Sequence, residues 1–334
     1  MQELFRLASK HKTELYLMKK KIFFVTALVV LMISFYYYKA LIEQTIFFAI
    51  ALIVIISVMI FFYYSKTQEP IINSNEDVNI VFAVDKNYYK HLPTVITSIL
   101  YNCHSLVSVN FFIITNEQEG SLDEQELTNL SKLHSSSYSF IYTNKDLTKS
   151  FDNIKTHSYV TAITNVRLLM PDILLNIDKV IYLDADLLVR DDISKLYNID
   201  ISDYMIAMSS DRSMWVAIRD IVFRRGHTFR LFGVYDIYYN AGVILMNLKK
   251  MRDNNYKEIL EVALQDKYIK KYTLADQDIL NVAYRNKILT LDKKWNDSPR
   301  KTTGKILHFR GGNKPWGNQN LEWERYRKIS LQNK

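Results

Sequence analysis

The sequence contains little cysteine and little glycine. Cys103 is the single cysteine among 334 residues, so an internal disulfide is excluded and a reducing compartment is favoured. Only eight residues are glycine, and there is neither a low-complexity tract nor an internal repeat of solenoid spacing, which excludes repeat architectures. What remains is the composition of a globular protein, long enough for one large domain or two small ones.

Charge is missing from two long apolar runs near the N-terminus, residues 22–38 and 46–64. They contain 17 and 19 residues, close to the roughly 20 that cross the hydrocarbon core of a bilayer as a helix. A signal peptide would have a shorter apolar region and a small-residue cleavage site. A pair of buried core helices is the alternative, but neither run has a polar face, so we expect a transmembrane hairpin of two spans.

The charges around these runs predict an orientation. Six Lys or Arg residues precede the first run, whereas the turn between the runs, residues 39–45, holds one lysine. The positive-inside rule then places the N-terminus in the cytoplasm, and two spans return the rest of the chain to that side, as in a protein of the bacterial inner membrane. We therefore expect a basic cytoplasmic segment (1–21), a transmembrane hairpin (22–64), a polar linker (65–77), a cytoplasmic domain (78–317) and a basic tail (318–334).

From residue 78 onward, short β-branched or aromatic runs alternate with amphipathic stretches. VNIVFAV (78–84) and VNFFIIT (109–115) are typical of buried strands, and LPTVITSILYNC (92–103) between them predicts a helix. This alternation predicts an α/β domain with a mostly parallel sheet covered on both faces. In such a sheet, ligands bind outside the carboxyl ends of the strands. Later strands are expected at 138–143, 179–189, 204–209, 241–248, 287–291 and 305–309.

Two carboxylates interrupt the apolar run VIYLDADLLV (180–189). Because a buried unpaired charge is costly, Asp184 and Asp186 need a cation, a set of donors or an exit from the core. The strand KVIYL ends just before them, and the side-chain period of two puts both carboxylates on one side, where they can converge on one ion. Hard oxygen ligands suit Mn²⁺ or Mg²⁺. A helix cap or a turn is the alternative for this short motif.

A second polar segment, ILHFRGGNKPWG (306–317), also follows a predicted strand. His308 can be a third ligand for Mn²⁺, and Lys314 can neutralise a diphosphate. Gly311 and Gly312 let the backbone approach a phosphate. Alone, the histidine could belong to the core and the segment could be an ordinary loop. Together with the acid pair, they indicate a site for a nucleotide diphosphate.

Five blocks in order carry a family resemblance. They are FAVDKNYYKHLPTVITSIL (82–100), RLLMPDIL with DKVIYLDADLLVRDDI (167–193), YYNAGVILMNLKKMR (238–252), LADQDILN (274–281) and HFRGGNKPW (308–316). This set resembles the signature blocks of family 8 glycosyltransferases, which include bacterial lipopolysaccharide galactosyl- and glucosyltransferases and glycogenin. The resemblance implies a GT-A fold for 78–317, a UDP-sugar donor, Mn²⁺ with Mg²⁺ as its substitute, and retention of anomeric configuration.

The resemblance also implies roles for individual residues. Asp184, Asp186 and His308 would hold the metal that bridges the UDP phosphates. Asp276 and Gln277 would face the sugar as catalytic residues. The donor-binding residues would be Ala83, Asp85, Arg167, Asn240, Gly311 and Lys314.

Retention of configuration allows two routes. A double displacement normally uses a carboxylate nucleophile. Because the amide of Gln277 is a poor nucleophile, we favour attack by the acceptor on the face that the diphosphate leaves, with the departing phosphate as base. A helix cap at Asp276 and a turn at Asn240 are the structural alternatives.

The expected function is that of a membrane-anchored, retaining hexosyltransferase that moves glucose or galactose from a UDP-sugar to a cell-envelope glycan or lipid-linked acceptor. One alternative is a catalytically inactive scaffold of the same fold, although the predicted metal ligands and Lys314 are all present. The other is a phosphatase that uses Asp-x-Asp after a strand. Leu188 stands where such a phosphatase usually has Thr or Val.

The C-terminal residues 300–334 are strongly basic, with nine Lys or Arg against two Glu, net +7. No nucleic-acid-binding motif accompanies the charge, so nucleic acid is not an expected partner. With Trp316 and Trp323 nearby, an anionic membrane surface is the predicted partner, and a merely solvated basic tail is the alternative.

Overall fold

The structure of the protein is a computed structural model. The chain divides into two compact units, Met1–Ile71 and Ile72–Lys334. The division falls inside the segment 65–77 that was predicted as a linker. The structure describes residues 24–31, 53–57, 77–104, 106–143, 162–210, 237–265, 276–285, 287–301, 303–312, 314–317 and 320–333.

The predicted transmembrane hairpin and the multi-pass membrane localisation built on it are corrected by the structure. In the first unit, the described helical residues are 24–31 and 53–57, and no helix in the described ranges is long and apolar enough to cross a bilayer. The rest of 22–64 lies outside the described residues.

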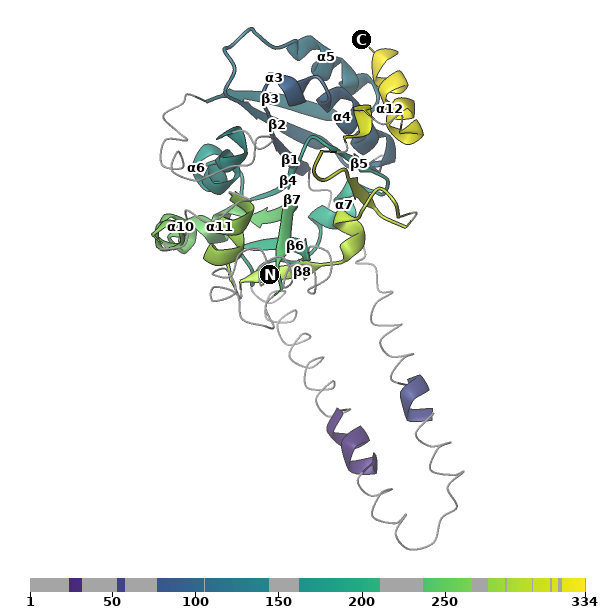
Figure 1. The fold of residues 1–334 in the computed structure, drawn as a ribbon, viewed down its shortest axis with the longest axis vertical. Helices are drawn as coiled ribbons and strands as arrows, with labels where there is room; N and C mark the ends of the chain where they lie inside the picture. The colour runs from purple at the N-terminus through teal and green to yellow at the C-terminus, as the bar shows by residue number, and fades with distance from the viewer. Residues whose placement is uncertain are drawn as a thin grey trace, which may run out of the picture. The chain divides into compact units, whose positions relative to one another are not determined.

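The centre of the second unit is a seven-stranded sheet (Figure 1). Its strands are β1 (Val78–Ala83), β2 (Val109–Thr115), β3 (Ser136–Tyr142), β4 (Lys179–Leu183), β6 (Ile206–Ser210), β7 (Tyr239–Asn247) and β8 (Ile288–Leu291). Their order is β3-β2-β1-β4-β7-β6-β8. Strands β1 to β4 are parallel to one another, β8 is parallel to β6, and β7 runs antiparallel to both β4 and β6. Six of these seven strands run in one direction, so the sheet is mostly parallel, as predicted. The reversed strand β7 makes it mixed, and this was not predicted because a buried apolar run does not specify strand direction.

Both faces of this sheet are buried, as the alternation of strands and helices predicted. On one face, Ile80 of β1 belongs to a core cluster with Ile96 of α4 (Leu92–Asn102) and Trp323 of α12 (Leu321–Leu331). On the other face, Val81 of β1 belongs to a cluster with Leu280 of α11 (Asp276–Ala283). Successive side chains of β1 thus point to opposite faces, as a strand requires.

Shorter helices connect these elements. The α-helices are α3 (Lys86–Tyr89), α5 (Glu124–Thr128), α6 (Met170–Ile173), α7 (Ile193–Tyr197), α9 (Leu248–Asp253) and α10 (Tyr256–Leu264). The 3₁₀ helices are η1 (Asn129–Lys132), η3 (Ala162–Leu169), η6 (Lys293–Asn296) and η7 (Pro315–Gly317).

The basic C-terminal segment contains a packed helix, α12, and the membrane surface predicted as its partner remains a prediction. Trp323 is fully buried in the core. The Trp316 ring stacks on His91, with ring centroids 3.6 Å apart. The Trp323 ring therefore lies within the core, and the Trp316 ring is partly buried against the same core.

A small antiparallel sheet joins two segments that were predicted to carry site residues. It pairs β5 (Leu187–Val189) with β9 (Ile306–His308) and sets His308 opposite Leu187. Next to this pair, the Phe309 N–H donates to the Asp186 carbonyl at 2.9 Å. The Asp184 N–H donates to the carbonyl of Gly242, in β7, at 2.9 Å. Backbone hydrogen bonds therefore fix the acid pair, the histidine and β7 in one place.

Candidate active site

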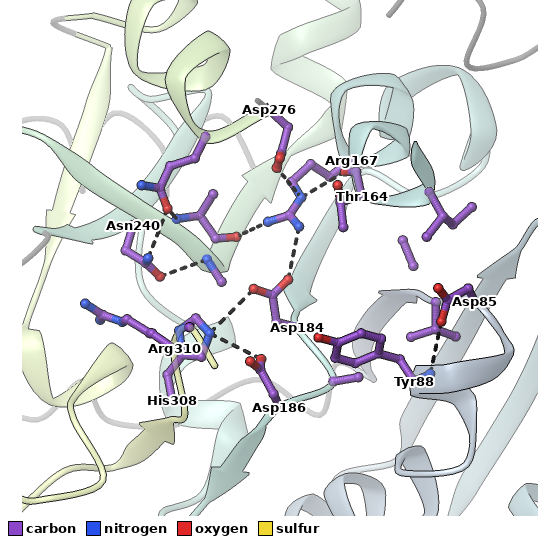
Figure 2. Close-up of a pocket in the computed structure, with 18 of the residues that line it drawn as sticks. Asp85, Tyr88, Thr164, Arg167, Asp184, Asp186, Asn240, Asp276, His308 and Arg310 are labelled. Atoms are coloured by element: carbon purple, nitrogen blue, oxygen red, sulfur yellow. Dashed lines mark hydrogen bonds and ion pairs between the residues drawn. The ribbon is translucent and has the colours of Figure 1, made fainter. Parts of the chain in front are cut away.

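A pocket of about 300 Å³ opens at the carboxyl ends of β1 and β4 (Figure 2). All eleven residues that the sequence predicted for the site line this pocket, so the structure brings together segments from the whole domain. Their individual roles remain predictions. The eleven residues are Ala83, Asp85, Arg167, Asp184, Asp186, Asn240, Asp276, Gln277, His308, Gly311 and Lys314.

Two carboxylates and an imidazole converge at the centre of the pocket. His308 Nε2 lies 3.3 Å from Asp186 Oδ1 and 3.5 Å from Asp184 Oδ2. One ligand atom from each residue lies within 4.8 Å of the others. Ligands held about 2.0–2.6 Å from a common ion are separated by no more than roughly 5 Å. Two carboxylate oxygens and one imidazole nitrogen therefore fit a single divalent cation such as Mn²⁺.

Lys314 adds a positive charge next to this cluster. Its Nζ contacts Asp186 Oδ2, and Asp186 is buried. Burial alone would raise the pKa of Asp186, but His308 and Lys314 outweigh it and hold the pKa below the usual range of a carboxyl. Although burial opposes its charge, Lys314 has a raised pKa because of Asp186. Both groups are therefore charged at neutral pH.

Arg167 connects the acid pair with the start of α11. Its Nη2 lies 3.1 Å from Asp184 Oδ1, its Nε lies 2.7 Å from Asp276 Oδ2, and its Nη1 donates to the Ala241 carbonyl at 2.6 Å. Burial opposes the guanidinium charge, but Asp276 and Asp184 outweigh it and raise the pKa of Arg167. This buried cation is thus fixed between two carboxylates.

Asp276 is a buried acid of the pocket whose pKa is raised. Burial and, to a smaller extent, the nearby charge of Asp184 raise its pKa to about 6 against the opposing effect of Arg167. The Arg167 Nε also donates a hydrogen bond to the Thr164 carbonyl at 3.0 Å. Among the described residues, Asp276 Oδ2 has an ion-pair partner but no aligned hydrogen-bond donor. Poor alignment explains why burial prevails over the ion pair.

Amide side chains form the wall near the first turn of α11. Gln277 Oε1 accepts from Asn240 Nδ2 at 2.9 Å and from the Ala241 N–H at 3.0 Å. Gln277 Nε2 donates to the Tyr238 hydroxyl at 3.1 Å, and that hydroxyl donates to Asp278 Oδ1 at 2.6 Å. The Gln277 side chain is therefore held by three hydrogen bonds in a defined orientation.

The opposite wall comes from β1 and α3. Asp85 Oδ1 accepts from the Tyr88 N–H at 3.0 Å and caps α3. Tyr88 lines the pocket, and its ring centroid lies 5.7 Å from Lys314 Nζ. Burial raises the pKa of Tyr88, so its hydroxyl is neutral at neutral pH. In Figure 2, Asp85 and Tyr88 lie across the pocket from Asn240 and Asp276.

Two glycines are required by the local geometry. A Cβ atom at Gly242 would lie 2.1 Å from His308 Cε1 and 2.9 Å from Asp184 Oδ2. Gly311 has a φ of +75°, a conformation that glycine adopts without steric cost. The first glycine therefore makes room for the side chains of His308 and Asp184, and the second allows the turn that leads to Lys314.

Several residues at or behind the pocket were not predicted from the sequence. Thr164 and Arg310 line it, whereas Tyr238 and Asn296 hold the lining residues by hydrogen bonds. Asn296 lies in η6, shortly after the carboxyl end of β8. The rule that drew attention to Asp184, a polar residue after a predicted strand, would also have selected Asn296.

The fold and this site together define a GT-A-like glycosyltransferase domain. The crystal structure of galactosyltransferase LgtC in complex with donor and acceptor sugar analogues has a TM-score of 0.64 and 25% sequence identity to this protein. That similarity covers 76% of this chain and 96% of the LgtC chain. The chain belongs to glycosyltransferase family 8, whose model matches residues 79–320.

Curated relatives agree with this assignment. A putative glycosyltransferase of Haemophilus influenzae is 27% identical over 256 residues, which are 72% of this chain and 74% of the relative. The lipopolysaccharide 1,2-glucosyltransferase of Escherichia coli is 26% identical over 286 residues, which are 78% of this chain and 80% of the relative. Because the chain belongs to this family, the alternative that it is an Asp-x-Asp phosphatase is set aside.

Proposed function

We propose that this family 8 glycosyltransferase is a retaining hexosyltransferase that moves glucose or galactose from a UDP-sugar to a glycan or glycolipid acceptor of the cell envelope. The observation that carries the proposal is the convergence of Asp184, Asp186 and His308, with ligand atoms within 4.8 Å, in the pocket that also contains Lys314. The relatives that act as a lipopolysaccharide glucosyltransferase and as a galactosyltransferase support these sugars and acceptors.

Asp184, Asp186 and His308 would hold Mn²⁺, with Mg²⁺ as its substitute. When bound, such an ion supplies electrostatic stabilisation to a departing diphosphate. Asp186 is already a carboxylate at neutral pH because its pKa is held low. Lys314 is protonated and lies beside it, so its ammonium group is placed to bind diphosphate oxygens, with the turn at Gly311 bringing the backbone close.

The sugar would lie against Asn240, Asp276 and Gln277. In the transfer step, the bond between the anomeric carbon and the diphosphate oxygen breaks, and a bond to the acceptor oxygen forms on the same face. The acceptor proton goes to the departing phosphate. Gln277 supports this route because its amide is a poor nucleophile and is held by Asn240, Ala241 and Tyr238. Its role is then to position the sugar.

Arg167 would link the two halves of the site. Its guanidinium contacts Asp184 on the metal side and Asp276 on the sugar side. A buried cation in this place balances the charge of two acids and fixes the rotamers of both. The nucleoside would lie toward Ala83 and Asp85, at the end of β1.

UDP release tests the proposal. The full-length protein is incubated with Mn²⁺ and a panel of UDP-sugars, and the wild type is compared with the Asp184→Ala, Asp186→Ala double variant. We expect metal-dependent UDP release from one hexose donor, absent in the double variant. Asp191→Ala is the matched control, since Asp191 lies close in sequence but pairs with Lys195 and Lys305 outside the pocket.

Two outcomes would contradict the proposal in different ways. Metal-dependent UDP binding without turnover of any donor, even with bacterial envelope glycans as acceptors, would favour the inactive scaffold. If the folded protein neither binds nor cleaves a UDP-sugar, the proposed nucleotide site is excluded.

A further inference from the structure

Backbone donors fix the orientation of two amide side chains behind the pocket. The Gly242 N–H donates to Asn240 Oδ1 at 3.0 Å, and the Ala241 N–H donates to Gln277 Oε1 at 3.0 Å. A backbone N–H can only donate, so the acceptor in each pair must be the amide oxygen. The usual ambiguity between the oxygen and nitrogen of an amide is therefore removed for Asn240 and Gln277.

The orientation of Asn296 follows from that of Asn240. Because Asn240 presents its oxygen, the Asn296 group that faces it at 2.8 Å must be Nδ2, the donor. Asn296 Oδ1 then faces His308 Nδ1 at 2.9 Å and accepts from Arg310 Nη2 at 2.8 Å. Arg310 has no acceptor of its own, so this contact independently requires an oxygen at that position.

The proton on His308 is located by the same chain of contacts. An amide oxygen cannot donate, so His308 Nδ1 must carry the hydrogen of its contact with Asn296. In a neutral imidazole, Nε2 then bears the lone pair, and it is Nε2 that lies 3.3 and 3.5 Å from the two carboxylates. An imidazolium would likewise keep its proton on Nδ1, so this nitrogen is protonated in either charge state.

We propose that Asn296 is a positioning residue that holds His308 as the Nδ1–H tautomer and directs its Nε2 lone pair to a metal between Asp184 and Asp186. The proposal rests on the metal-dependent function proposed above. Asn296 is fully buried and forms hydrogen bonds with three residues that line the pocket, His308, Asn240 and Arg310. A hydrogen bond of this kind fixes the tautomer and ring orientation of a metal ligand and raises its basicity.

The amide chain also reaches the sugar side of the pocket. Gln277, Asn240, Asn296 and His308 are consecutive members of one hydrogen-bonded series. All polar contacts in the series are satisfied only in the single orientation derived above. A group that faces the sugar and a group that faces the metal are therefore held by one network, which makes their placement mutually dependent.

The tautomer can be measured in the wild-type protein without any substitution. The full-length protein is labelled with ¹⁵N-histidine, and long-range ¹H–¹⁵N correlation spectra are recorded at pH 8 with and without Mg²⁺. The His308 signals are those lost in His308→Gln. We expect a protonated Nδ1 and an unprotonated Nε2 in both samples. A proton on Nε2 with an unprotonated Nδ1 would overturn the proposal.

Metal affinity in the absence of donor gives the second test. Mn²⁺ binding is followed by electron paramagnetic resonance for the wild type and for Asn296→Leu, with circular dichroism as a check on folding. We expect an affinity loss of about 10- to 100-fold. Asn79→Ala is the control, because Asn79 also donates two hydrogen bonds, to the Lys179 carbonyl and the Tyr197 hydroxyl, but at the other end of β1.

The outcomes separate this proposal from the proposed function. Unchanged Mn²⁺ affinity in a folded Asn296→Leu protein would overturn the role of Asn296. If the leucine variant does not fold, the tautomer of the wild type decides the question. If the wild type binds no Mn²⁺, the metal-dependent function fails, whereas the histidine spectrum still confirms or overturns the hydrogen bond that Asn296 makes.

Discussion

His308 Nε2 lies 3.3 Å from Asp186 Oδ1, although one residue ends β9 and the other follows β4. The pairing of β5 with β9 and the hydrogen bond from the Phe309 N–H to the Asp186 carbonyl hold the two side chains at this distance. Backbone contacts thus hold the acid and the base side by side. Preorganisation of this kind lowers the cost of binding a metal.

Replacement of Asp186 by asparagine removes one charged ligand with little change in volume. We expect Asp186→Asn to lose Mn²⁺ binding and to lower UDP-sugar turnover by about 10²-fold or more, because the stabilisation of the leaving diphosphate is lost. Mn²⁺ titration and UDP release measure the two effects. Asp191→Asn serves as the control and should behave as the wild type. Normal turnover by Asp186→Asn would exclude this carboxylate as a ligand.

Gly242→Ala tests the space that the metal ligands need. The new Cβ would lie 2.1 Å from His308 Cε1, so the ring or the strand must move. We expect a loss of about 1–3 kcal/mol in the free energy of unfolding and weaker Mn²⁺ binding, measured by denaturant titration and electron paramagnetic resonance. Gly317→Ala is the matched control, since nothing lies within 4 Å of its Cβ position. Equal metal affinity in Gly242→Ala and the wild type would contradict the assigned geometry.

Gln277→Ala removes the amide that accepts from Asn240 and Ala241. We expect a fall in kcat of about 10²-fold, because a small misplacement of the sugar is costly in a positioned reaction. Mn²⁺ affinity should change much less than kcat, because Gln277 is not a metal ligand in this account. Steady-state kinetics of transfer and metal titration provide the comparison. Near-normal transfer by the variant would show that Gln277 has no important role at the reacting centre.

The raised pKa of Asp276 predicts that the free energy of unfolding depends on pH. Its pKa is raised from the usual 3.8 to about 6 in the folded protein, so between these values the folded state binds more protons than the unfolded state. The free energy of unfolding therefore contains a favourable contribution below about pH 4 that is lost as the pH rises to about 6. The free energy of unfolding is measured over pH 4–6 for the wild type and for Asp276→Asn. The difference between the two slopes against pH gives the contribution of Asp276. Identical slopes would contradict the raised pKa.

Much of the domain was predictable because its strands are short, apolar and separated by polar turns. The strand expected at 109–115 has the observed bounds of β2, and the helix expected at 92–103 is α4, which ends one residue earlier. The direction of β7 was not predictable. Its residues are nearly all buried, and burial on both faces is the same for a parallel and an antiparallel strand.

The site was predictable where polar residues follow strands in recognisable blocks, as at Asp184 and His308. It was not predictable where a residue acts through another side chain. Tyr238 supports the pocket by a hydrogen bond to Gln277, and Asn296 does so by hydrogen bonds to Asn240, His308 and Arg310. The position of Asn296 after a strand could have marked it as a candidate, but the sequence does not indicate which side chains it contacts. The apolar runs at 22–64 were instead over-interpreted. Their hydropathy predicted two transmembrane spans, and no helix in the described ranges is long and apolar enough to form one.

The central claim is that Asp184, Asp186 and His308 hold a divalent ion needed by a UDP-sugar. Calorimetric titration of the full-length protein with UDP, in Mn²⁺ and then in EDTA, tests it most directly. The account predicts UDP binding that weakens at least about tenfold in EDTA, and binding by Asp186→Asn that is equally weak in both conditions. UDP binding of equal strength with Mn²⁺ and with EDTA would contradict the account.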